Sequence, residues 1–89
     1  MEKILKELQG DFIEDLPSAL DAIISCHISQ DMDALYQAVH RLKGAAAVCQ
    51  YDRIAAVCES YCEALREQRY DELDHCHAEL ILACSEIQA

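Results

Sequence analysis

The sequence predicts an all-α fold, an antiparallel up-and-down four-helix bundle, from two observations. The chain of 89 residues contains only two glycines, one proline and one phenylalanine, whereas Ala, Leu, Ile, Glu and Asp are plentiful, a composition that favours helices over a sheet. Apolar residues also recur with the 3.6-residue period of amphipathic helices, in four segments joined by short connections. The length suits one domain, which we assign to residues 1–89.

The first helix is expected over residues 2 to about 28, interrupted by Gly10 and Pro17. Proline removes a backbone hydrogen bond and its ring clashes with the preceding turn, so we expect a kink or a split near residues 13–17. His27, at the end of the segment, is expected to interact with the C-terminal helix dipole. The apolar stripe of this helix comprises Leu5, Leu8, Phe12, Leu16, Ala19, Ile23 and His27.

The second helix is expected from about residue 31 to 48, with Ser29 or Asp31 as its N-cap. Its core-facing stripe comprises Leu35, Val39, Leu42, Ala46 and Cys49. His40 lies just off this stripe, on a neighbouring face, because positions three and four apart stack on the same side. The other members of that face are Tyr36, Lys43, Gly44 and Ala47. A glycine inside a helix costs about 1 kcal/mol relative to alanine. The simplest reason for Gly44 is that another molecule must come very close to His40.

The third and fourth helices follow after short connections. We expect the third over about 52–68, capped by Asp52, and the fourth over about 71–87, capped by Asp71. Their apolar stripes comprise Ile54, Val57, Cys58, Tyr61 and Leu65, and then Leu73, Cys76, Leu80, Cys84 and Ile87. A solvated acidic face is expected to comprise Glu59, Glu63, Glu67, Asp71, Glu72 and Asp74.

Charge and cysteine content exclude several classes of protein. The formal net charge is −10, whereas binding to nucleic acid or to an anionic membrane surface requires basic patches. No stretch approaches the ~20 apolar residues of a membrane span, and the charged, amphipathic start Met1-Glu2-Lys3-Ile4 is unlike a signal peptide. The six cysteines mostly occupy positions that suit a small apolar residue. We therefore expect reduced core thiols in a cytoplasmic, monomeric protein.

The run His40-Arg41-Leu42-Lys43-Gly44 resembles the H-x-L-K-G signature of histidine-phosphotransfer (HPt) domains, the phosphoryl shuttles of bacterial two-component phosphorelays. The resemblance extends to Phe12-Ile13-Glu14-Asp15-Leu16-Pro17, which is similar to the family's first-helix pattern, and to the spacing from there through Gln30-Asp31 to the histidine. Five residues alone are a weak signal, but they are specific in the middle of the second helix of a small bundle. One departure is Gln50, which stands where the family often has a second glycine, in the turn into the third helix.

The resemblance implies that His40 accepts a phosphoryl group from a receiver-domain aspartyl-phosphate and passes it to, or receives it back from, a response-regulator receiver. A neutral imidazole is a competent nucleophile near pH 7, since its unperturbed pKa is about 6.5. Lys43 is placed to stabilise the phosphoryl charge, and Gly44 to give the partner steric access. Gln37, one turn before His40, is either a hydrogen-bond donor to the imidazole or phosphoryl group or a plain exposed residue. Arg41 points away from the His40 face and is expected to be a surface charge or to touch the partner's rim.

The resemblance also implies that the partner supplies most of the machinery. The receiver brings the aspartate and Mg²⁺, and this domain binds no cofactor. The sequence has neither a Gly-rich phosphate loop nor a G-x-x-x-x-G-K-[ST] run, so the chain is a phosphoryl carrier rather than an autonomous kinase. It is either a stand-alone protein or part of a hybrid histidine kinase, whose own receiver is then a candidate partner.

Two alternatives remain open at this stage. A phosphorylation-incompetent HPt-like module would dock a regulator without carrying phosphate. A Cys/His metal or redox bundle would use Asp74-His75-Cys76-His77 together with Cys58 and Cys62, whose donor types suit zinc. Positions 75 and 77 face opposite ways on a helix, and the two cysteines also fit core positions, so this second alternative is the weaker one. We therefore expect no metal site.

Overall fold

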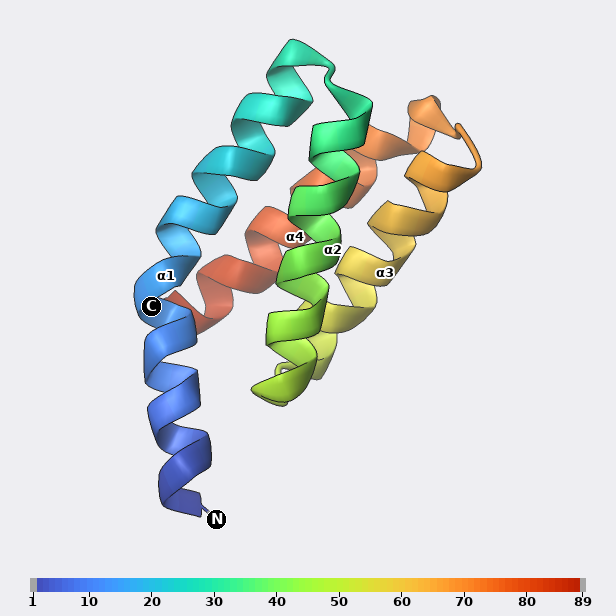
Figure 1. Cartoon of the computed structure of the whole chain (residues 1–89). Coiled ribbons are helices and arrows are strands. Elements are labelled where there is room, and N and C mark those ends of the chain that lie inside the picture. Colours follow the sequence, from blue (N-terminus) through green and yellow to red (C-terminus); the bar gives the residue numbers. More distant parts are fainter. Residues whose placement is uncertain (1, 89) are drawn as a thin grey trace.

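The computed structural model describes residues 2–88, which are helical apart from short connections. In chain order the elements are α1 (Glu2–Ser29), α2 (Met32–Val48), α3 (Asp52–Arg66), the 3₁₀ turn η1 (Tyr70–Glu72) and α4 (Leu73–Gln88) (Figure 1). No strand occurs between residues 2 and 88, and the all-helical prediction is confirmed.

The four α-helices pack in the order of the chain. α1 contacts α2, α2 contacts α3 and α3 contacts α4, while contacts between α1 and α4 close the bundle. In Figure 1 the chain reverses direction at each connection, and α4 crosses the bundle obliquely. The molecule is elongated, measuring 41 × 20 × 20 Å, and α2 runs along its length with neighbours on both sides.

Helix α1 runs without interruption from Glu2 to Ser29, so the expected split near residues 13–17 is wrong. Pro17 lies inside the helix and is exposed. A proline in a helix interior costs about 3 kcal/mol. Burial of the apolar side chains on either side of it offsets this cost; they are Phe12, Leu16, Leu20 and Ile23. A kink at Pro17 stays a prediction.

The core consists of the predicted apolar stripes with few exceptions. Every predicted core position of α2 and α3 is buried, as are Leu73, Cys76, Leu80 and Cys84 of α4. Five of the six cysteines are buried and all six are free thiols, so their predicted place in the core is confirmed for all but the half-buried Cys26. Leu8 is the main exception, because it is 40% exposed on the wall of a groove between α1 and α2.

Three glutamines end the first three helices in the conformation that favours glycine. Gln30, Gln50 and Gln68 have φ angles of 61°, 63° and 57°. After α2 the Tyr51 amide donates to the carbonyl of Ala46 over 2.9 Å, and the Gln50 amide donates to the carbonyl three residues back over 3.1 Å. This is the Schellman pattern of a helix C-terminus. The turn at Gln50 therefore keeps a glycine-like backbone without a glycine.

Only one of the predicted caps is confirmed. The carboxylate of Asp31 accepts a hydrogen bond from the Ala34 amide over 3.2 Å and caps α2. Asp52 is instead the first residue of α3, after Tyr51, and Asp71 lies in η1 rather than at the start of α4, so both of these predictions are wrong. Asp52 still places a negative charge in the first turn of α3, where the helix dipole favours it.

A chain of polar side chains ties the end of α1 to α3 and α4. His27 Nε2 lies 3.1 Å from Asp74 Oδ1, and Tyr61 Oη lies 3.2 Å from the Nδ1 atoms of both His27 and His77. The two imidazole rings are stacked, with centroids 4.2 Å apart. A hydroxyl has one proton, so Tyr61 donates to one imidazole and accepts from the other. The cluster therefore requires at least one Nδ1 to be unprotonated if the Tyr61 proton is to have an acceptor.

Acid should destabilise this cluster. Burial, and then the neighbouring His27, lower the pKa of His77 below its ordinary value. The folded protein consequently binds fewer protons than the unfolded chain, whose histidines titrate near about 6.5. The free energy of unfolding should therefore fall as the pH drops below about 6.5, until the pH passes below the folded-state pKa of His77. Urea unfolding of the native protein at about pH 7.5 and about pH 5 measures this loss.

His77→Asn keeps a polar atom near the Nδ1 position and should reduce the loss, whereas the exposed control His75→Asn should not. An unchanged pH dependence in His77→Asn would show that another group is responsible.

Candidate functional site

His40 stands on the solvent-exposed face of α2, in the middle of the helix. The buried residues of α2 all lie on the other side; they are Leu35, Val39, Leu42 and Ala46. Val39 is fully buried, and one further residue turns the helix by ~100°, which carries His40 out of the core. The packed stripe thus holds the helix that presents the imidazole to solvent.

The imidazole contacts an aromatic neighbour one turn before it. The rings of Tyr36 and His40 are nearly parallel, at 7°, with centroids 5.8 Å apart. Within residues 2–88 no side-chain hydrogen bond or ion pair engages His40. Both ring nitrogens are therefore free of the protein's own polar groups, which leaves one for attack and one to carry a proton.

Lys43 and Gln37 differ in how they lie beside the histidine. Lys43 is half-buried, and its charge counteracts the desolvation that raises the pKa of Cys62, which places the lysine on the α3 side of α2. Among the described residues Lys43 forms no ion pair, so its ammonium group is free to meet an anion. Gln37 is exposed and makes no hydrogen bond to His40 in this part of the chain. Its contact with a phosphoryl group stays a prediction.

Gly44 is not required by the packing of the domain itself. A Cβ atom added at this position would meet nothing within 4 Å, and the residue has an ordinary helical backbone. Neither internal crowding nor a positive φ explains a glycine that costs about 1 kcal/mol in a helix. Gly44 therefore leaves an open surface one turn after His40.

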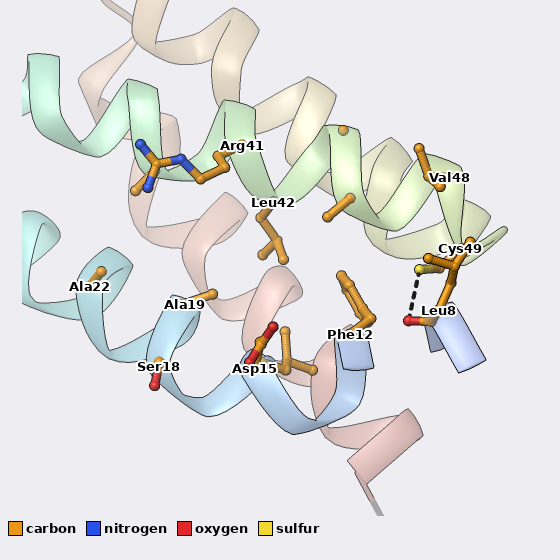
Figure 2. Close-up of a pocket in the computed structure, with 14 residues that line it drawn as sticks. Leu8, Phe12, Asp15, Ser18, Ala19, Ala22, Arg41, Leu42, Val48 and Cys49 are labelled. Atoms are coloured by element: carbon orange, nitrogen blue, oxygen red, sulfur yellow. Dashed lines mark hydrogen bonds between the residues drawn. The ribbon is translucent and has the colours of Figure 1, made fainter. Parts of the chain in front are cut away.

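Next to this surface lies a groove of about 630 Å³ between α1 and α2 (Figure 2). Its walls are mostly apolar or small; they include Leu8, Phe12, Ala19, Ala22, Leu42, Gly44, Ala45 and Val48. Asp15 and Arg41 add one charge from each helix. At one end the Cys49 thiol donates to the Leu8 carbonyl over 3.4 Å and Gln9 Nε2 donates to the Cys49 carbonyl over 2.9 Å, which joins the two helices. Gly44 belongs both to this groove and to the His40 face.

The groove is the feature that sequence reasoning missed. Arg41 is predicted to point away from the His40 face, and it does so by lining the groove. The available signal was a pair of apolar residues off the core stripes, Leu8 and Val48, which are 40% and 63% exposed. Alanines on the facing sides of the two helices, where larger side chains would fill the space, were a second signal.

The family profile of the Hpt domain matches residues 7–89. This chain belongs to the Hpt domain family. Membership implies histidine phosphotransfer in phosphorelays, and Hpt domains generally interact with receiver domains. No curated protein and no solved structure matches this chain.

The cysteines and remaining histidines of this Hpt domain serve its packing. Burial raises the pKa of Cys58 to about 12 and that of Cys84 to about 11, so both thiols are protonated and weakly reactive. His75 is exposed and pairs with Glu79 over 2.9 Å, away from the Tyr61–His77 contact. Across residues 2–88 no three Cys, His, Asp or Glu side chains are grouped to hold a metal ion. In the same range no helix is both long and apolar enough to cross a membrane.

Proposed function

We propose that His40 is the phosphoaccepting residue of this Hpt domain and that it exchanges a phosphoryl group with the aspartate of a response-regulator receiver. The observation that carries the proposal is an exposed imidazole with both nitrogens unengaged, followed one turn later by a glycine around which the space is open. Both lie in the H-x-L-K-G run of a chain that belongs to the family.

The chemistry needs only a neutral imidazole on this side. The lone pair of the unprotonated nitrogen attacks phosphorus, the N–P bond forms, and the P–O bond to the receiver aspartate breaks with its electrons returning to the carboxylate. The other nitrogen keeps its proton, so the ring becomes cationic until that proton is released to water. The transition state spreads charge over three oxygens, so positioning and nearby cations supply most of the catalysis. The receiver contributes the aspartate and Mg²⁺.

We propose that the receiver docks across the His40 face and the neighbouring α1–α2 groove. The groove offers apolar surface that is exposed in the free domain, including Leu8 and Val48. Gly44 lies between this surface and His40, so a partner seated in the groove can bring its reacting edge close to the imidazole. Such contacts would supply binding energy while the histidine stays accessible.

Lys43 should contribute charge neutralisation. Replacing Lys43 with glutamine removes a cation on the His40 face, and we expect the rate of phosphotransfer from a receiver to fall roughly 10-fold, because an exposed charge is screened by water. Lys43→Arg should retain most of the rate. Rapid-quench kinetics with a phosphorylated receiver measures the effect, and Lys6→Gln, an equal charge change on exposed α1 surface, is the control. Equal rates for both glutamine variants would remove Lys43 from the site.

The proposal is tested by loading receiver domains with a small acyl phosphate and Mg²⁺, adding this protein, and following both masses. The expected result is a phosphoryl group that leaves the receiver and appears on this chain, acid-labile and alkali-stable. The phosphorylated chain, once isolated, should return the group to an unphosphorylated receiver. Binding to a receiver without any transfer would support the docking module that carries no phosphate.

A further inference from the structure

We propose that Tyr36 is a positioning residue that holds the His40 imidazole in its attacking orientation by ring stacking. This inference rests on the proposed role of His40. Tyr36 precedes His40 by one helical turn, so the two side chains are neighbours on the same face. Their rings lie at 7° with centroids 5.8 Å apart, within the range of offset aromatic stacking.

Tyr36 is suited to act as a fixed surface. Its side chain is half-buried and packs against the core, whereas His40 is exposed. An exposed side chain distributes itself among several rotamers unless a contact selects one. No hydrogen bond or ion pair within residues 2–88 selects a rotamer for His40. The anchored phenol ring is therefore the contact that restricts the imidazole plane.

Stacking orients the ring without occupying its nitrogens. A carboxylate hydrogen-bonded to one nitrogen would fix the tautomer and raise the basicity of the ring. The face of Tyr36 does neither, so both nitrogens remain available for attack and for carrying the proton. After transfer the ring is cationic, and the electron-rich face of a phenol favours a cation. The same contact would thus stabilise the phosphorylated product.

The test compares Tyr36→Leu, which keeps apolar cover but removes the ring, with Tyr36→Phe, which keeps the ring and removes the hydroxyl. Tyr70→Leu, on the exposed tyrosine of η1, is the control. We expect Tyr36→Leu to slow transfer from a receiver about 2- to 12-fold, the factor that corresponds to one aromatic pair. Tyr36→Phe and Tyr70→Leu should transfer at close to the native rate.

A second readout uses the free protein and needs no receiver. The ring current of Tyr36 should displace the NMR signals of the His40 ring protons, and only Tyr36→Leu should return them to ordinary positions. Moved signals with a native transfer rate would overturn the inference, and so would equal losses of rate in Tyr36→Phe and Tyr36→Leu. If no receiver phosphorylates the native protein, the proposed function fails, whereas displaced His40 signals would still show the stack.

Discussion

Replacing His40 with glutamine should abolish phosphoryl uptake from a phosphorylated receiver and leave the fold intact. The amide nitrogen of glutamine is not a nucleophile, so no N–P bond can form. The imidazole is exposed and makes no hydrogen bond within residues 2–88, so the change in the free energy of unfolding should stay within about 0.5 kcal/mol. Intact-mass measurement with a phosphorylated receiver should show no gain, and urea unfolding should give a native-like midpoint.

The matched control is His75→Gln. His75 is another exposed histidine in a helix, and its partner Glu79 contributes little at the surface. This variant should take up one phosphoryl group at the native rate. Uptake by His40→Gln would mean that another side chain accepts the phosphoryl group, and its loss in both variants would point to a general defect.

Replacing Gly44 should stabilise the free domain and impair its function. A Cβ at this position meets nothing within 4 Å, so Gly44→Ala should gain roughly the 1 kcal/mol of helix propensity that glycine forfeits. A partner that approaches His40 closely would meet the added side chain. Displacement of the reacting groups by about 1 Å can cost on the order of 10²-fold in rate. We expect Gly44→Leu to lose about that factor and Gly44→Ala to lose less.

Gly10 provides the control for this effect. It is also an exposed helical glycine at which an added Cβ atom would meet open space, but it lies in α1 outside the groove. Gly10→Ala should therefore gain similar stability in thermal unfolding while phosphotransfer stays at the native rate. If Gly44→Leu transferred as fast as Gly10→Leu, the glycine would have no role in partner access.

The fold class and the place of His40 could be predicted because both depend on local periodicity. The stripe through Leu35, Val39 and Leu42 assigns one side of the helix to the core, and a residue one position away from such a stripe must lie near its edge or outside it. The burial of five cysteines followed from the same pattern.

Helix boundaries and the groove could not be predicted because they depend on tertiary packing. Nothing local marks Gln50 for a left-handed backbone, since glycine is the residue that this conformation favours. Pro17 predicted a split, yet burial on both sides keeps α1 continuous. The groove arises where Leu8 of one helix faces Val48 of another, 40 positions apart in the chain.

The most direct test of the account is tandem mass spectrometry of the native protein after incubation with a panel of phosphorylated receivers, performed under neutral to alkaline conditions that preserve phosphohistidine. The account predicts one phosphoryl group, located on His40, with the other three histidines unmodified. A phosphoryl group on any other residue would contradict it. So would the absence of phosphorylation with every receiver that binds, which would leave a docking module that carries no phosphate.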